Sequence, residues 1–272
     1  CEKVEELSHL FEADAERVKK IIRGELEIGQ VVAGDIDADR MDYLSRDAHY
    51  SGLEYGNIDM ATIIRLASID SRRIVFDYKA VQALESLFTA RFHMIKSLYR
   101  HHAVNIAEMM LQRSLESFVD SEIRKLMDMN DYEAHSTLKQ SGGVSGKLYR
   151  RIENRDLYKR AAVMREGELS RDELRDIAEN IDPGSIERQI AEETGVDQSE
   201  VIVDLPSIPA IKDIDVKLKR NSRVESLTET SPIVKSLSKA EWRMVSFKVY
   251  CPETIKQKVG KKSEKIIRDR VK

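Results

Sequence analysis

The sequence has few cysteines and no long run of apolar residues. Its two cysteines, Cys1 and Cys251, lie at opposite ends of the 272-residue chain. Two distant cysteines do not form the disulfide framework of a small secreted domain. The chain also lacks a signal-peptide pattern and any apolar run near the roughly 18 residues of a membrane-spanning helix. We therefore expect a soluble, cytoplasmic protein with no membrane partner.

Net charge is almost absent as well. The 45 Lys and Arg residues nearly balance the 48 Asp and Glu residues, and the net charge is −3 although 34% of the chain is charged. The overall charge therefore gives no electrostatic footprint for nucleic acid or a membrane. The chain begins with Cys1 rather than Met, so we expect it to start downstream of its natural first residue.

Hydrophobic periodicity predicts a helical body over residues 1–168. In the best-defined helix, Asp37 is expected as the N-cap and Gly52 as the C-terminal glycine. The other helices are expected at 4–23, 59–68, 79–119 and 121–140, and in the segment that begins at 148. Extended segments are expected at 29–37 and 71–77, and a glycine-rich loop at 141–146.

Residues 169–272 predict a smaller α+β lobe. Two short helices are expected at 170–181 and 184–195, separated by an Asp-Pro-Gly sequence. Strands are expected at 201–206, 214–219 and 243–251, and a basic helix at 253–272. The predicted fold class is mainly α, with a helical body and a small C-terminal α+β lobe.

One predicted helix carries an unusual polar stripe. Asp39, Tyr43 and Asp47 follow one another at i, i+4 and i+8, so two carboxylates and a phenol lie on one side of the helix. Arg40 and Arg46 flank them. Carboxylates bind hard cations and Arg binds phosphate oxygens, so the stripe suits a cavity for a metal and a phosphate. On spacing alone, a solvated face with paired charges is the simpler explanation.

A second predicted helix, within residues 90–110, is rich in cations and rings. Arg91, Ile95 and Tyr99 share a stripe at helical spacing, and Lys96 and His101 lie on neighbouring faces. Such a surface suits a bound triphosphate with a ring against its sugar. Taken alone, the pattern also fits core aromatics with surface histidines.

Together, the two segments resemble HD-domain phosphohydrolases of the deoxynucleoside triphosphate triphosphohydrolase type. The resemblance rests on the IDADRMDYLSRD sequence that ends at Asp47, on the YG-x-I-D sequence from Tyr55, and on Arg91, Tyr99 and His101 with their family spacing. The LYRRIENRDLYKRA sequence at 148–161 is also similar. The resemblance implies an HD-domain body and, as in dGTPase-type enzymes, release of triphosphate from a deoxynucleoside triphosphate by metal-activated water. It leaves the preferred base open.

The resemblance also implies roles for individual residues. Asp39 matches the last ligand of a His, His-Asp, Asp set that holds a divalent metal such as Mg, Mn, Fe, Zn or Ni. Tyr43 and Asp47 match the sugar side of the pocket. Tyr99 matches a ring near the 2′ carbon that disfavours ribose. The matched phosphate contacts are Arg40, where some members have Lys, together with Arg91 and Lys96. Arg155 and Lys159 match positions that bind regulatory nucleotides in some members.

The His-Asp dipeptide of the family is missing from this sequence. Its histidines are not followed by Asp at any position, and only 38 residues precede Asp39. The six are His9, His49, His93, His101, His102 and His135. Either the upstream ligands lie outside this chain, or the protein is a natural member that has lost them. The non-Met start favours the first explanation, so we expect this 272-residue chain alone to bind metal poorly and to have little activity.

Two rival functions remain open at this point. One is a catalytically incomplete protein that binds nucleotide or nucleic acid in a regulatory role. The other is an HD phosphohydrolase of a different phosphate ester. The expected partners are a nucleotide substrate, further copies of the chain in a homo-oligomer, and nucleic acid in weak contact with the basic C-terminal segment.

Overall fold

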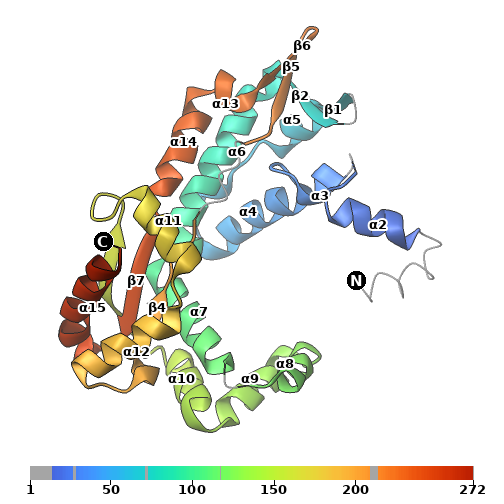
Figure 1. Cartoon of the computed structure of the whole chain (residues 1–272). Coiled ribbons are helices and arrows are strands. Elements are labelled where there is room, and N and C mark those ends of the chain that lie inside the picture. Colours follow the sequence, from blue (N-terminus) through green and yellow to red (C-terminus); the bar gives the residue numbers. More distant parts are fainter. Residues whose placement is uncertain (1–13, 27–28, 71–72, 117, 209–213, 272) are drawn as a thin grey trace. The chain divides into compact units, whose positions relative to one another are not determined.

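The computed structural model describes residues 14–26, 29–70, 73–116, 118–208 and 214–271. Helices predominate over two small sheets in these ranges (Figure 1), which confirms the predicted mainly α fold with a small α+β component. The chain packs as two compact units, formed by residues 1–97 with 210–241 and by residues 98–209 with 242–272. We call them the first and the second unit. The predicted boundary after residue 168 is not one of these limits and stays a prediction.

The first unit combines short helices with a four-stranded sheet. Its helices are α2 (Ala15–Ile22), α3 (Gln30–Ala33), α4 (Ala38–Ser51), η2 (Glu54–Gly56), α5 (Met60–Arg65), η3 (Tyr78–Ala80), α6 (Val81–Met94), α13 (Leu227–Thr230) and most of α14 (Pro232–Trp242). Its strands are β1 (Ala67–Asp70), β2 (Arg73–Asp77), β5 (Lys217–Arg220) and β6 (Arg223–Ser226), in the order β1-β2-β5-β6. Strands β2 and β5 pair in parallel, and the other neighbours in this sheet are antiparallel.

Helix α4 begins and ends where the sequence predicts. The Asp37 carboxylate accepts a hydrogen bond of 2.6 Å from the backbone N–H of Arg40, which satisfies a free N–H group of the first turn. Gly52 ends the helix with a left-handed φ of 70°, a conformation that glycine adopts without steric cost. Leu44 and Ala48 form the buried side of the helix. These local signals fix the rotation and length of the helix that carries the predicted site residues.

The second unit surrounds a three-stranded antiparallel sheet with helices. The strands β3 (Lys159–Arg165), β7 (Ser246–Cys251) and β4 (Ile202–Asp204) lie in that order, with β7 in the centre. The helices are α7 (His102–Leu115), α8 (Asp120–Met127), α9 (Asp131–Gln140), α10 (Gly143–Glu153), α11 (Arg171–Asn180), α12 (Pro183–Thr194), η5 (Gln198–Glu200), η6 (Glu253–Ile255) and α15 (Lys256–Arg270). These elements confirm the predicted helices at 170–181 and 184–195 and the predicted strands at 201–206 and 243–251, whereas the strand predicted at 214–219 is β5 in the sheet of the first unit.

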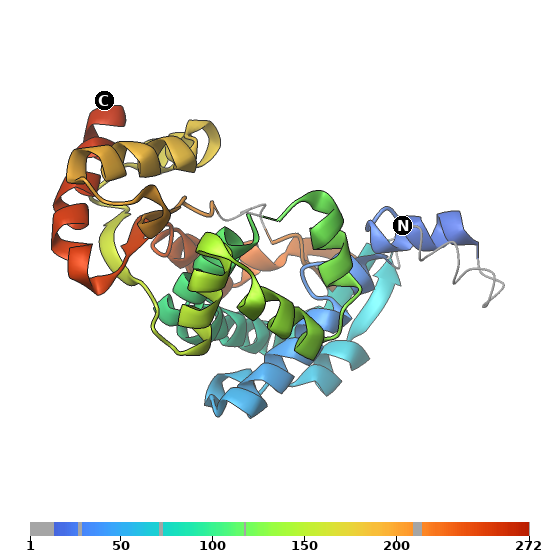
Figure 2. The same cartoon turned by 90° about the horizontal axis from the view of Figure 1, so that it is seen from below.

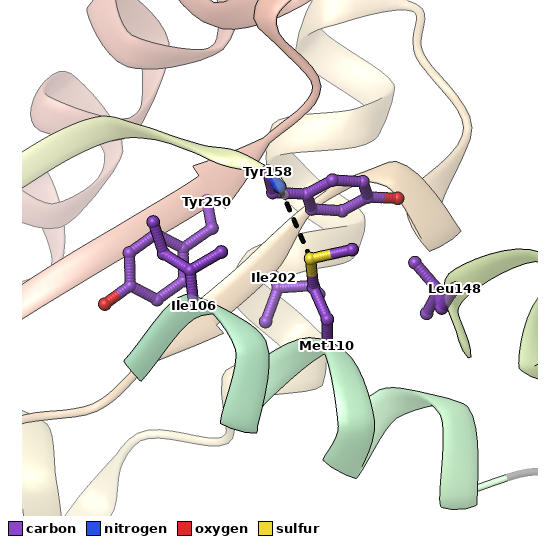
Figure 3. Packing of buried hydrophobic residues seen from close by; sticks show 6 residues of the cluster. All are labelled: Ile106, Met110, Leu148, Tyr158, Ile202 and Tyr250. Atoms are coloured by element: carbon purple, nitrogen blue, oxygen red, sulfur yellow. Dashed lines mark hydrogen bonds between the residues drawn. The ribbon is translucent and has the colours of Figure 1, made fainter. Parts of the chain in front are cut away.

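Large side chains fill the core between α7, α10 and the sheet (Figure 3). Met110 is fully buried, and its Sδ accepts a hydrogen bond of 3.3 Å from the backbone N–H of Tyr158. Tyr250 is buried too, and its hydroxyl donates to Asp204 at 2.9 Å. Ile106, Leu148 and Ile202 complete the cluster. The Tyr158 hydroxyl donates to the Ser199 carbonyl at 3.4 Å, so each buried phenol keeps a polar partner at the edge of an apolar core.

The predicted continuous helix over 79–119 is wrong. Helix α6 ends at Met94, a π-helical segment η4 (Ile95–Tyr99) follows, and α7 begins only at His102. His101 caps α7, because its Nδ1 accepts a hydrogen bond of 3.4 Å from the backbone N–H of Ala103. The sequence contains no Gly or Pro here, so no local breaker announces the interruption.

Two predicted irregular segments are helical instead. The glycine-rich segment 141–146 contains the first turn of α10, because Ser145 is buried and bonded to Ser114, with 3.0 Å from the Ser114 hydroxyl to the Ser145 carbonyl. The segment 29–37 contains the short helix α3, where the Gln30 side chain accepts a hydrogen bond of 2.8 Å from the backbone of Ile74 in β2. Tertiary contacts override local propensity at both places.

The expectation of no membrane span agrees with the helices that the structure describes. Over the described ranges, every helix is too short or too polar to cross a bilayer.

Candidate functional site

The predicted polar stripe lies along one side of α4, next to its buried side. Asp39 is exposed, whereas Tyr43 and Asp47 are half-buried. Each stands one residue before a position of the inward-facing row that includes Leu44 and Ala48. Because neighbouring helical residues are about 100° apart, the stripe borders the core rather than facing directly away from it. A ligand that lay along this side would contact two carboxylates and a phenol together.

A short helical turn, η2, holds the other side of α4 in place. A Cβ atom on Gly56 would lie 2.3 Å from the Ala48 Cβ and 2.6 Å from the Leu44 carbonyl oxygen, so only glycine fits. The Ser45 hydroxyl donates to the Gly56 carbonyl at 3.3 Å. The YG-x-I-D sequence thus has a structural role: it fixes the backbone beneath the polar stripe.

An aromatic pair joins η2 to α6. The rings of Tyr55 and His93 are stacked, with 4.7 Å between their centroids and 19° between their planes. Tyr55 remains 44% exposed, so the pair lies at the surface of the first unit. The sequence does not predict this contact, because the separation of Tyr55 and His93 in the chain matches no local periodicity.

Arg40 is held against the start of α4. Its Nη1 donates to the backbone carbonyl of Asp35, and its Nη2 lies 3.8 Å from the Asp37 carboxylate. Its buried Nε has no hydrogen-bond partner among the residues that the structure describes. The guanidinium therefore stabilises the N-terminal end of α4 in this conformation. Its predicted contact with phosphate stays a prediction.

The second set of predicted residues lies at and beyond the C-terminal end of α6. Arg91 is half-buried in the last turn of α6, Lys96 is exposed in η4, and Tyr99 is half-buried at the end of η4. A π turn holds more residues than an α turn, so the i, i+4, i+8 spacing no longer defines a common stripe for Arg91 and Tyr99. π segments are frequent at functional sites, and both η4 residues keep their predicted roles as predictions.

The described residues do not make up a complete metal site. Among them, no group of three or more His, Cys, Asp or Glu side chains is placed to hold a metal ion. Asp39 is exposed and contributes one carboxylate, fewer than the set of ligands that a metal centre requires. His9 lies outside the described residues. An HD-type metal would need ligands from beyond the described part of the chain.

The second unit has a cationic region where α7 begins. Burial lowers the pKa of His102, and the positive charges of His101, Arg160 and Lys159 lower it further. The rings of His101 and His102 are 4.3 Å apart. Arg155, another predicted nucleotide contact, has a φ of 55° although it is not glycine. His101, Arg160 and Lys159 thus bring positive charge close to His102.

Comparison with known proteins finds a matching family and related proteins that are longer than this chain. Residues 58–269 match the model of a family described as the HD associated region. Protein MJ1154 of Methanocaldococcus jannaschii, itself uncharacterized, is 33% identical over 267 residues, which cover 94% of this chain and 57% of MJ1154. YwfO of Bacillus subtilis, also uncharacterized, is 36% identical over 89 residues, which cover 33% of this chain and 21% of YwfO. The chain thus spans little more than half the length of MJ1154.

Two solved structures share the fold. A phosphohydrolase from Bacteroides thetaiotaomicron aligns with a TM-score of 0.65 and 20% identity, covering 92% of this chain and 70% of that protein. A hypothetical protein from Aquifex aeolicus aligns with a TM-score of 0.68 and 22% identity, covering 90% of this chain and 64% of that protein. The family match begins after α4, so the polar stripe precedes the matched region.

Proposed function

Because the chain belongs to the family of HD-associated regions, we propose that it is part of a phosphohydrolase that acts on deoxynucleoside triphosphates. The products are a deoxynucleoside and inorganic triphosphate. The observation that carries this proposal is the row of Asp39, Tyr43 and Asp47 beside the buried side of α4. The shared fold with a protein named as a phosphohydrolase supports the general reaction class.

In this proposal, the residues of α4 bind the sugar. The Asp47 carboxylate accepts a hydrogen bond from a sugar hydroxyl, and the half-buried Tyr43 ring packs beside it. Tyr99 packs near the 2′ carbon and disfavours ribose. A carboxylate that accepts a hydrogen bond from one hydroxyl orients the sugar and also adds affinity, because a sugar without that hydroxyl leaves the carboxylate unpaired.

In the same proposal, the cationic side chains of Arg91, Lys96 and Arg40 bind the triphosphate. Arg91 is well suited to this role, because its guanidinium makes no hydrogen bond or ion pair with any residue that the structure describes. Its planar guanidinium can donate two parallel hydrogen bonds to phosphate oxygens. Lys96 adds a compact charge from the exposed side of η4. Arg40 joins them only if it leaves the Asp35 carbonyl.

A divalent metal belongs to the proposed enzyme, and Asp39 is its predicted ligand, although the described residues contain no group of three or more potential ligands. When bound, such a metal supplies activated water and neutralises phosphate charge. The identity of that metal stays open among Mg, Mn, Fe, Zn and Ni. We expect the 272-residue chain by itself to bind nucleotide without rapid hydrolysis.

The first experiment measures dGTP binding to the chain by calorimetry, with two matched variants of α4. Asp47→Asn removes the proposed sugar contact, and we expect about tenfold weaker binding from the lost charge-assisted hydrogen bond. Asp42→Asn is the control, because Asp42 is exposed and its carboxylate pairs with Arg46. Equal binding by both variants, or no binding of dGTP by the chain, contradicts the proposal.

The second experiment tests the reaction. MJ1154 and the 272-residue chain are each incubated with dGTP, GTP and a panel of other phosphate esters in the presence of Mn²⁺. We expect MJ1154 to release triphosphate from dGTP and the chain to release little. Hydrolysis of a different ester favours another HD phosphohydrolase. Nucleotide binding without hydrolysis by either protein favours a regulatory member.

A third measurement concerns the choice between deoxyribose and ribose. We expect Tyr99→Ala to reduce the preference for dGTP over GTP in binding to the chain. An unchanged preference would remove Tyr99 from the proposed sugar pocket.

A further inference from the structure

Helix α15 is fixed in rotation by a close contact with strand β3. A Cβ atom on Gly260 would lie 2.4 Å from the carbonyl oxygen of Ala161, so the helix backbone approaches the strand as closely as glycine allows. Val259, Ile266 and Ile267 are buried on the same side, and α12 packs alongside (Figure 2). The helix therefore presents a defined outer face.

Cations occupy the middle of that outer face. Lys258, Lys261, Lys265 and Arg268 are all exposed. At about 100° per residue, they fall within an arc of about 80°, centred opposite the buried side. We call these four residues the basic stripe. The exposed acids of the helix, Glu264 and Asp269, lie at the two edges of this arc rather than inside it.

The other cations of α15 are already engaged within the second unit. The Lys262 ammonium lies 3.2 Å from the Glu193 carboxylate, and that of Lys256 lies 3.8 Å from Glu253. The Arg270 guanidinium donates to Ser185 and Gln189, each at 2.9 Å. These contacts tie the flanks of the helix to its neighbours and leave the basic stripe pointing outward.

The basic stripe itself is poorly neutralised. Within the described ranges, the ammonium groups of Lys258 and Lys261 make no hydrogen bond or ion pair. Lys265 contributes to the lowered pKa of Glu193, after Gln189 and Lys262, so it lies in that carboxylate's field without a direct bond. Arg268 has the same relation to Glu173, whose pKa is lowered mainly by hydrogen bonds from Ser170. An anionic partner would therefore compete with few existing contacts.

We propose that the basic stripe docks on the phosphate backbone of duplex nucleic acid, without recognition of sequence. Its four charges extend over about 15 Å of helix, a length over which a duplex carries many phosphates. The stripe has no apolar side chain to insert into a lipid surface, since the apolar side of α15 is buried. It also has no aromatic ring on which an unpaired base could stack. This inference does not depend on the proposed hydrolase activity.

The test is fluorescence anisotropy of a labelled 24-base-pair DNA duplex titrated with the purified chain at several salt concentrations. We expect binding in the micromolar range at low salt, as is common for contacts with phosphate alone. Lys261→Ala with Lys265→Ala should weaken binding about tenfold for any sequence. The double variant should also reduce the steepness of the log–log salt dependence by about 1 for each phosphate that the protein no longer neutralises.

Two matched controls accompany the double variant. Arg124→Ala with Lys125→Ala removes two exposed cations from α8 in the same unit and should leave binding unchanged. Lys261→Arg with Lys265→Arg should retain binding, because a phosphate contact needs charge rather than a particular head group. Circular dichroism melting checks that each variant folds.

Three outcomes would overturn the inference. The first is a duplex affinity and salt slope that do not change in the Lys261→Ala and Lys265→Ala variant. The second is at least tenfold tighter binding to a single strand than to the duplex. The third is binding to phosphatidylserine vesicles, lost in the same variant, with no binding to DNA. Because dGTP binding is measured separately, failure here leaves the proposed function intact.

Discussion

The contact between α4 and η2 in the first unit differs from the contact between α7 and the sheet in the second unit. In the first unit, α4 and η2 meet through small groups, Gly56 against Ala48, and a row of polar residues borders that contact. In the second unit, large side chains such as Met110 and Tyr158 fill the space between helix and sheet. The first arrangement keeps polar side chains at the edge of a close backbone contact. The second encloses its polar groups, such as the Tyr250 hydroxyl, within the protein. The first contact leaves Tyr43 and Asp47 half-buried beside it, whereas the second encloses Met110 and Tyr158 completely.

The buried phenols of the second unit illustrate this difference. Burial raises the pKa of Tyr158 to about 12 and also raises the pKa of Tyr250, whose hydroxyl donates to Asp204. Both phenols therefore remain protonated at neutral pH and act as hydrogen-bond donors. Tyr43 of the first unit, by contrast, is half-buried on a helix side where a ligand could contact it.

The largest effect should come from emptying the core of the second unit. Met110→Ala removes a fully buried side chain and leaves a cavity beside Tyr158. We expect a loss of about 3 kcal/mol in the free energy of unfolding, measured by urea denaturation. Met127→Ala is the matched control, since Met127 is 80% exposed and should change stability by less than about 0.5 kcal/mol. Equal losses would mean that the core is not closed around Met110.

A smaller and more local effect should follow in the first unit. Gly56→Ala places a methyl group 2.3 Å from the Ala48 Cβ, so η2 must move away from α4. We expect a loss of about 2 kcal/mol and faster hydrogen exchange in α4, with the sheet of the second unit still protected. Gly142→Ala is the control, because a methyl group there would meet no described residue within 4 Å beyond its chain neighbours. Unchanged exchange in α4 would show that this contact does not support the polar stripe.

The smallest effect concerns the pH dependence of the second unit. Burial raises the pKa of Glu187 above its ordinary value of 4.5, although bonds from Arg113 and the backbone of Val203 oppose the shift. Because its pKa is raised in the folded state, protonated Glu187 contributes fully to the free energy of unfolding below pH 4.5. This contribution is lost as the pH rises through the folded-state pKa. Glu187→Gln cannot titrate, so wild type should lose stability relative to this variant as pH rises from about 4 to 7.

That comparison needs a carboxyl control in the same network. Glu116→Gln also removes a partner of Arg113, 2.9 Å from its Nε, but at an exposed site. Urea midpoints of all three proteins at several pH values separate the two sites. If the difference between wild type and Glu187→Gln stays constant with pH, the burial of Glu187 does not govern its titration.

The sequence predicts those parts of the fold that are encoded locally. Asp37 and Gly52 mark the ends of α4 because a capping carboxylate and a left-handed glycine act within a few residues. The helices around the Asp-Pro-Gly sequence follow the same rule, since Asp182 caps α12 and Pro183 occupies its first turn. The polar stripe was visible for this reason also: it needs only the period of one helix.

The remaining features depend on contacts between distant residues. The helical start of α10 relies on the bond from Ser114 to Ser145, which no local pattern indicates. The stack of Tyr55 on His93 and the π segment η4 arise from packing as well. Arg91 and Tyr99 would share one stripe only on a regular α-helix. The π segment η4 changes the number of residues per turn between them, so that prediction was wrong.

The close contact between α15 and β3 makes the two sides of α15 differ in the substitutions that they tolerate. Replacement of Gly260 would disturb the fold, because no side-chain atom fits between the helix and Ala161. Replacement of Lys258 or Lys261 would leave every described intramolecular bond in place. The charge of the outer face can therefore be changed by substitution while the close contact between α15 and β3 stays in place.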